Sequence, residues 1–197
     1  SCDLMPSVGS KIINFARDLA KKSKLKPYDQ KSHVGFLRYL ALRFGQNTNE
    51  LMVNIVTSYE DLDMLVPFVE SLVNEFPEIT SVVNNINTRK ADVSFGEREI
   101  LLHGKPIINE KLKDLTFQIS ANSFFQTKSL MAEKLYDVIL NSANLKGAEI
   151  VYDLYCGAGS ISLFLARKAK FVYGFDIIVS SIENAEQNAC LLYTSPS

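Results

Sequence analysis

Two acidic residues and two glycines have the types and the spacing of a site for a nucleotide-like cofactor. Asp153 follows an apolar, β-branched run, and Gly157 and Gly159 come after it in a short loop. Asp176 closes the next apolar stretch. Glycine permits positive φ angles and leaves the backbone open to a ligand. An acidic residue about 20 positions beyond the start of such a loop can accept hydrogen bonds from both hydroxyls of a ribose.

The elements that must position these residues are those of an open α/β sheet. Residues 150–154 and 171–175 predict strands, and residues 161–169 carry apolar side chains at helical spacing. Free N–H groups at the start of that helix favour a carboxylate of the ligand. A dinucleotide-binding loop would have a third glycine at position 162, where this chain has Ser162, and an Asp153 before the loop is unusual there. We therefore predict S-adenosylmethionine as the cofactor, with an ordinary turn as the alternative.

The first 115 residues predict a separate α+β unit. Apolar residues recur at helical spacing from 8 to 19, after Ser7 as the expected N-cap, and again over residues 62–76. Four strands are expected: residues 36–44 and 51–57 as a hairpin, and residues 79–86 and 99–103. Helices on a mostly antiparallel sheet form an α+β unit. A strand at residues 117–120 and a helix at residues 131–140 then lead into the cofactor-binding unit.

Composition limits the class of protein. The chain has 197 residues, of which 47% are apolar, and a net charge of −1, which is compatible with one large or two small packed domains. No stretch is long and apolar enough to span a membrane, and no secretory signal opens the sequence. Three cysteines, at positions 2, 156 and 190, cannot form a disulfide framework. We expect a cytoplasmic protein with no membrane partner.

Positive charge is concentrated in the first quarter of the chain. Residues 1–50 hold nine Lys and Arg against four Asp and Glu, and the cluster contains Lys21, Lys22, Lys24 and Lys26. A cationic segment of this kind is compatible with binding to a nucleic-acid backbone. The alternative is that a helix C-terminus attracts these cations through its dipole.

Three segments together resemble the RNA uracil-C5 methyltransferases, a family that methylates C5 of a uridine in ribosomal or transfer RNA. They are residues 118–127 (QISANSFFQT), residues 153–160 (DLYCGAGS) and residues 181–185 (SIENA). Residues 36–40 (FLRYL) also resemble a segment of the family's central domain. The resemblance extends from about Cys2 to Ala189.

The resemblance implies a fold and a division into domains. Residues 116–189 would form the N-terminal part of a Rossmann-like, class I S-adenosylmethionine-dependent methyltransferase sheet, an α/β fold. Residues 1–115 would form a smaller α+β central domain that faces RNA. Residues 190–197 fall outside the resemblance, and we expect this tail not to be native to the family.

The resemblance also implies roles for single residues. Gln126 would hold the cofactor through its side-chain amide, Tyr155 would pack against it, and Asp176 would bind its ribose. Ser160 stands where many members of the family have an Asn near the cofactor. The predicted cofactor-binding residues are Gln126, Tyr155, Asp176, Ser160, Gly157, Gly159 and Asp153.

The family's reaction requires a cysteine thiolate that adds to C6 of uracil and a base that removes the proton from C5. In the family both groups lie beyond the second strand, so we expect no catalytic residue in this sequence and no turnover by this chain alone. Cys156 is expected to be a small, partly buried residue and not the nucleophile. Cys2 matches the last ligand of a four-cysteine [4Fe-4S] site that some members carry, and an ordinary cysteine is the alternative.

The implied activity is methylation of a uridine in RNA, with 23S rRNA as the first expectation and tRNA as the second. The intact protein is expected to be a monomer. Two other classes of function stay open: a non-catalytic module that binds S-adenosylmethionine and RNA, and a methyltransferase for a small molecule or a protein. The fold alone does not separate these classes, because the same sheet serves many substrates.

Overall fold

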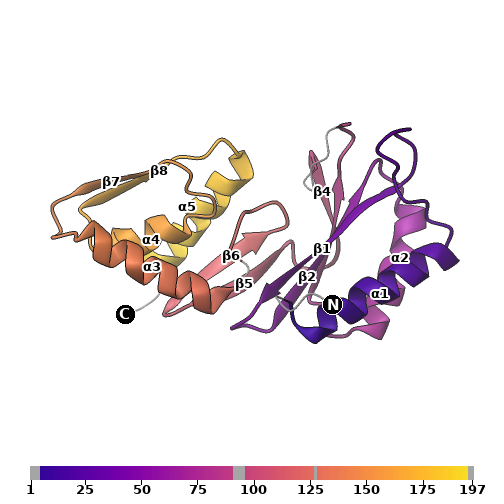
Figure 1. Ribbon diagram of the computed structural model, residues 1–197, viewed down its shortest axis with the longest axis horizontal. Coiled ribbons are helices and arrows are strands. Elements are labelled where there is room, and N and C mark those ends of the chain that lie inside the picture. Colours follow the sequence, from indigo (N-terminus) through magenta and orange to yellow (C-terminus); the bar gives the residue numbers. More distant parts are fainter. Residues whose placement is uncertain (1–4, 91–95, 127, 195–197) are drawn as a thin grey trace. The chain divides into compact units, whose positions relative to one another are not determined.

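The computed structural model describes residues 5–90, 96–126 and 128–194, which form two compact units (Figure 1). The first unit comprises Ser1–Phe44 and Asn49–Ile108, and the second comprises Gly45–Thr48 and Asn109–Ser197. The first unit thus ends at residue 108, earlier than the expected 115. The short loop Gly45–Thr48 joins the second unit because the buried Glu110 carboxylate accepts hydrogen bonds from the N–H groups at positions 46 (2.6 Å) and 47 (3.0 Å).

The first unit is a four-stranded sheet with two helices. Its elements are α1 (Ser7–Lys22), β1 (Leu37–Gly45), β2 (Glu50–Thr57), α2 (Leu62–Glu75), β3 (Ser81–Ile86) and β4 (Arg98–Gly104), and the strand order is β1-β2-β3-β4. β1 and β2 are neighbours joined by four residues, which confirms the predicted hairpin. β3 runs antiparallel to β4 but parallel to β2, because α2 crosses over between β2 and β3.

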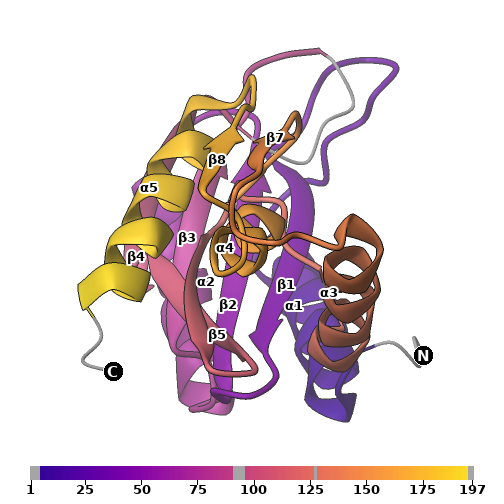
Figure 2. The same cartoon turned by 90° about the vertical axis from the view of Figure 1, so that its left-hand side faces the viewer.

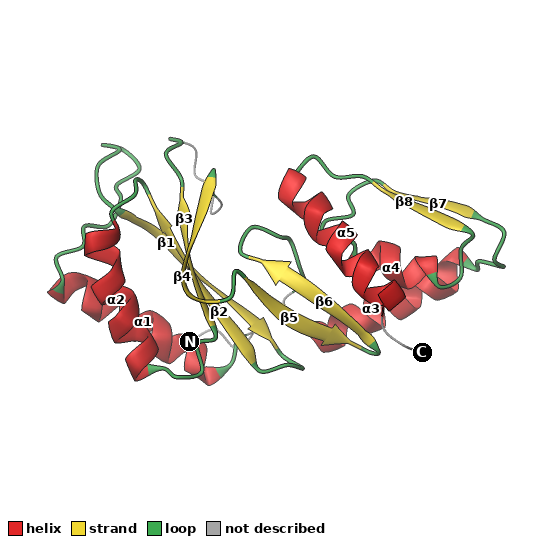
Figure 3. Ribbon diagram, turned by 180° about the vertical axis from the view of Figure 1, so that it is seen from behind, coloured by secondary structure: helices red, strands yellow, loops and turns green. Residues whose placement is uncertain are grey.

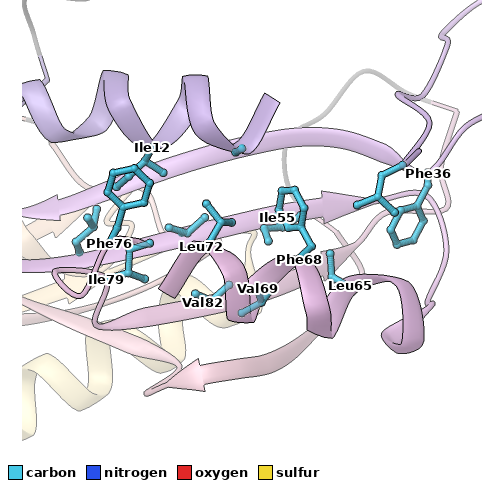
Figure 4. Close-up of a cluster of buried hydrophobic side chains, with 14 residues drawn as sticks. Ile12, Phe36, Ile55, Leu65, Phe68, Val69, Leu72, Phe76, Ile79 and Val82 are labelled. Carbon is cyan, nitrogen blue, oxygen red and sulfur yellow. The ribbon is translucent and has the colours of Figure 1, made fainter. Parts of the chain in front are cut away.

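The core of the first unit lies between the sheet and its two helices (Figure 4). Its side chains come from both helices and from β2 and β3, and include Ile12, Ile55, Leu65, Phe68, Leu72 and Val82. α2 begins where Asp61 accepts a hydrogen bond from Met64 N (3.0 Å), as an N-cap does. The prediction of Ser7 as the N-cap of α1 is wrong by one residue. Gly9 N donates to Pro6 O (2.9 Å), so the first turn begins at Pro6 and Ser7 lies inside the helix.

The lysine cluster of the first unit straddles the end of α1. Lys21 and Lys22 lie in the last turn of the helix, where the helix dipole stabilises cations. Lys24 and Lys26 follow the helix and are exposed. The dipole thus stabilises the first two lysines, and binding of a nucleic-acid backbone by the exposed cluster stays a prediction.

The second unit carries the predicted cofactor site. Its elements are β5 (Ile107–Leu112), whose first two residues belong to the first unit, β6 (Leu115–Ser120), α3 (Ser129–Ala143), β7 (Ile150–Asp153), α4 (Ser160–Ala166), β8 (Phe171–Gly174) and α5 (Val179–Thr194). β5 pairs with β6, and β7 runs parallel to β8, with Ile150 opposite Phe171. α4 is shorter than the predicted helix over residues 161–169. After Ala166 the chain turns, with Lys168 N and Ala169 N both donating to Leu165 O (2.9 and 3.0 Å), and Lys170 N then donates to Glu149 O (2.9 Å).

All three helices of the second unit lie on one side of the β7–β8 pair (Figures 1 and 3). α4 contacts both α3 and α5, and Figure 2 shows it between them. Phe164 of α4 packs against Phe117 and Tyr136, with ring centroids 6.1 and 5.2 Å away. In the described part of the chain, no helix is long and apolar enough to cross a membrane.

Candidate functional site

The glycine loop connects β7 to α4, as the sequence predicts. Gly157 and Gly159 have φ angles of +54° and +80°, a region that L-residues rarely adopt. A Cβ added to Gly159 would lie 3.1 Å from Ala185 Cβ, so this glycine allows α5 to approach the loop. A Cβ added to Gly157 would lie no closer than 3.6 Å to another atom, Phe124 O. That distance is an ordinary van der Waals contact, so at the buried Gly157 the positive φ angle favours glycine, and crowding does not.

Asp176 lies against this loop. Its Oδ2 accepts a hydrogen bond from Gly157 N (3.0 Å), and its Oδ1 accepts one from Ile178 N (2.9 Å). Cys156 N also donates to Phe175 O (3.0 Å), so the end of β8 and the loop are held together. Each carboxylate oxygen of Asp176 accepts through one lone pair and has a second that can accept from a ligand hydroxyl.

Asp153 and Ser160 have partners within the protein. Asp153 Oδ2 accepts a hydrogen bond from Ser162 Oγ (2.7 Å), which explains why a serine stands where a dinucleotide-binding loop has its third glycine. Ser160 Oγ lies 2.8 Å from the hydroxyl of Tyr136, a buried residue. Burial raises the pKa of Tyr136, so its hydroxyl stays protonated. Both contacts hold the two ends of the glycine loop in place.

Gln126 and Tyr155 face outward. Tyr155 is 88% exposed, and Gln126 is also exposed. Neither side chain makes a hydrogen bond to another residue that the structure describes. The segment that carries Gln126 lies beside the glycine loop, since Phe124 O is the atom nearest to a Cβ added at Gly157. An amide and an aromatic ring are thus available to a ligand next to this loop.

Two residues near the site were not among the predicted site residues, although Asn184 lies in the segment 181–185 that carries the resemblance. Asn184 and Asn188 of α5 are buried, and their amides bond to β6, to the turn after it and to the glycine loop. The signal that could have revealed them is their spacing. Together with the buried Ser181, they recur at helical intervals on a face that would ordinarily be apolar.

Residues 72–193 match the sequence model of a family described as tRNA (Uracil-5-)-methyltransferase. The chain belongs to this family. The match continues through residue 193 and so includes part of the tail, residues 190–197, for which no resemblance was expected. α5 likewise continues through Thr194.

Relatives within and near the family support this assignment. An uncharacterized RNA methyltransferase of Chlorobaculum tepidum is 42% identical over 190 residues, which are 96% of this chain and 39% of the relative. One of Halalkalibacterium halodurans is 38% identical over 190 residues, 96% of this chain and 42% of the relative. The chain spans about two fifths of the length of these curated relatives.

A solved structure shows the fold class. The crystal structure of Pyrococcus abyssi tRNA (uracil-54, C5)-methyltransferase in complex with S-adenosyl-L-homocysteine superposes with a TM-score of 0.76 at 34% identity. The superposition covers 96% of this chain and 44% of that one. The second unit is thus part of the α/β fold of class I S-adenosylmethionine-dependent methyltransferases, as predicted.

The cysteines of this family member differ in their surroundings. Cys156 is buried in the glycine loop, and burial raises the pKa of its thiol, as do the nearby carboxylates of Asp153 and Asp176. A raised pKa disfavours the thiolate, so Cys156 has the environment of a structural cysteine. Cys2 lies outside the described residues, and its proposed part in an iron–sulfur site stays a prediction. Among the residues that the structure describes, no cluster of three or more His, Cys, Asp or Glu could hold a metal ion.

Proposed function

We propose that this chain is the cofactor-binding part, with an adjoining α+β unit, of an enzyme that methylates C5 of a uridine in RNA. The observation that supports this proposal best is the arrangement at the glycine loop. Asp176 bonds to Gly157, and the side chains of Gln126 and Tyr155 lie exposed. The chain is also 34% identical to a tRNA (uracil-54, C5)-methyltransferase crystallised with S-adenosyl-L-homocysteine.

The residues present fit S-adenosylmethionine. We assign the two ribose hydroxyls to Asp176, whose carboxylate is already fixed at the loop by Gly157 N. Gln126 would hold the cofactor through its side-chain amide, and Tyr155 would pack its exposed ring against it. Gly157 has the positive φ angle that gives the loop its shape, and its N–H bonds to the Asp176 carboxylate. When bound, the cofactor supplies an electrophilic methyl group.

C5 of uracil is a weak nucleophile, so the methyl transfer needs further groups. A thiolate that adds to C6 makes C5 nucleophilic, and after methylation a base removes the C5 proton before the thiol leaves. The buried Cys156 does not suit the first role, because its pKa is raised. We propose that both groups come from residues outside this sequence, as its relatives are more than twice as long. The chain alone would bind the cofactor without turnover. We also continue to expect that the protein acts in the cytoplasm.

The RNA product provides the test of this proposal. The complete gene that carries this sequence is expressed in a strain without 5-methyluridine in its RNA, and nucleosides from purified tRNA and 23S rRNA are measured by mass spectrometry. We expect 5-methyluridine in one of the two RNAs and its loss in the Asp176→Asn variant. Methyl transfer to protein or small molecules, with none to RNA, would favour the other class of methyltransferase. Cofactor binding with no methylation at all would favour the non-catalytic module.

A further inference from the structure

α5 carries a buried polar face next to the glycine loop. Ser181, Asn184 and Asn188 are only 1%, 6% and 1% exposed. A helix that packs against a sheet usually does so with apolar side chains. A buried amide destabilises the fold unless its hydrogen bonds are made. The hydrogen bonds of the two asparagines therefore indicate which parts of the structure these buried amides hold in place.

Asn188 joins β6 to the glycine loop. Its Oδ1 accepts a hydrogen bond from Gln118 N (2.6 Å), and its Nδ2 donates to Gln118 O (3.2 Å). The amide thus pairs with both backbone groups of one β6 residue, as a neighbouring strand would. Its Nδ2 also donates to Ala158 O (2.9 Å), the carbonyl between the two glycines of the loop.

Asn184 holds the turn that leads to Gln126. Its Nδ2 lies 2.8 Å from Ser123 Oγ and 3.0 Å from Ser120 Oγ. These two hydroxyls lie 2.8 Å apart, and Ser123 N donates to Ser120 O (3.3 Å), which closes the turn. Ser123 is fully buried and stands three residues before Gln126.

We infer that Asn184 and Asn188 are positioning residues of the cofactor site. Asn188 fixes the glycine loop to β6, and Asn184 fixes the turn that presents Gln126, so one helix sets the distance between the two ligand-binding segments. The close approach of α5 to Gly159 is made by Ala185 and not by either amide. The inference rests on the proposed function for the identity of the ligand, S-adenosylmethionine.

Two measurements on the chain test this inference. In the ligand-free protein, Asn188→Ala should increase amide hydrogen exchange across residues 154–159, and Asn184→Ala should increase it across residues 120–126. Each variant should also weaken the binding of S-adenosyl-L-homocysteine about tenfold, because a buried partner is left without its hydrogen bond. Gln187→Ala, an exposed position on the same helix, should change neither quantity.

A purely structural role would give a different pattern. Leu112→Ala removes a fully buried side chain of β5, a strand that neither asparagine touches, and serves as the control for lost stability. The asparagine variants are compared with this control in melting temperature, in the dissociation constant for S-adenosyl-L-homocysteine and in hydrogen exchange of the loop. If all three quantities change by the same amounts as in Leu112→Ala, the inference is wrong.

A milder variant guards against loss of folding. Ser123→Ala removes one acceptor of Asn184 and leaves both asparagines in place, and we expect affinity to fall about threefold. In the Asn184→Ala/Ser123→Ala double variant the losses should be less than additive, because the hydrogen bond between these two side chains is lost in either single variant. Additive losses would overturn the inference. If the wild-type chain binds no S-adenosyl-L-homocysteine, the proposed function fails, and the exchange data alone decide whether the asparagines position the loop.

Discussion

Alanine should have different effects at the two glycines of the cofactor loop. Gly157 has a φ of +54°, and an added Cβ there meets no atom closer than 3.6 Å. Gly159 has a φ of +80°, and its added Cβ would lie 3.1 Å from Ala185 Cβ. A left-handed conformation costs an L-residue about 1–2 kcal/mol, and an overpacked contact adds about 1–3 kcal/mol. We expect a loss of about 1–2 kcal/mol for Gly157→Ala and about 2–5 kcal/mol for Gly159→Ala.

The assay is urea unfolding followed by far-ultraviolet circular dichroism. The free energy of unfolding of each variant is obtained with one shared value for its dependence on urea concentration. Gly147→Ala is the matched control, because Gly147 also has a positive φ, +95°, but nothing lies within 4 Å of an added Cβ. Ala185→Gly costs about 1 kcal/mol by itself inside a helix, and it should cost less in the Gly159→Ala background, since it removes the atom that the new methyl group meets. Equal losses at Gly159 and Gly147, or the same cost of Ala185→Gly in both backgrounds, would refute the close approach of α5.

Three further predictions concern buried and paired side chains. At pH 8, iodoacetamide should modify the exposed Cys190 well before the buried Cys156, because the pKa of the buried thiol is raised. Equal modification rates, measured by peptide mass spectrometry, would contradict the burial of Cys156. Glu110→Ala should lower the free energy of unfolding by about 2–4 kcal/mol, measured by chemical denaturation, because the buried carboxylate accepts hydrogen bonds from three backbone N–H groups and a serine hydroxyl. A loss below about 1 kcal/mol would argue against these contacts. The hydrogen bond from Arg167 lowers the pKa of Asp114. The stabilising contribution of Asp114 is therefore complete above its unfolded-state pKa and is lost as the pH falls through its folded-state pKa. Asp114→Asn should make the melting temperature depend less on pH over that acidic range, and an unchanged pH dependence would count against the pair.

The sequence predicts the elements whose signals are local. β7, the glycine loop and β8 follow from short apolar runs, from Gly157 and Gly159 and from Asp176, because each signal lies within a few residues of the element it marks. β5 was not predicted, since its buried position 110 is a glutamate and the apolar alternation is broken there. α5 was missed for a similar reason, because polar Ser181, Asn184 and Asn188 occupy its buried face.

The contacts inside the site depend on register, which the sequence does not reveal. Asp176 reaches Gly157 N only because β7 and β8 pair with Asp153 opposite Gly174. Ser162 was predicted only as a departure from a glycine motif, whereas the structure gives it a hydrogen bond to Asp153. Both contacts join residues whose mutual distance is set by the strand pairing and the crossover helix.

The central claim is that the glycine loop and Asp176 bind S-adenosylmethionine, and isothermal titration of the chain with S-adenosyl-L-homocysteine tests it most directly. We expect one site per chain and an affinity about tenfold weaker in Asp176→Asn, because the ribose hydroxyls lose a charged acceptor. Asp137→Asn, which changes an exposed carboxylate of α3 that pairs with Lys113, should leave the affinity unchanged. A folded chain that binds no S-adenosyl-L-homocysteine, or an Asp176→Asn variant that binds as tightly as the wild type, would contradict the account.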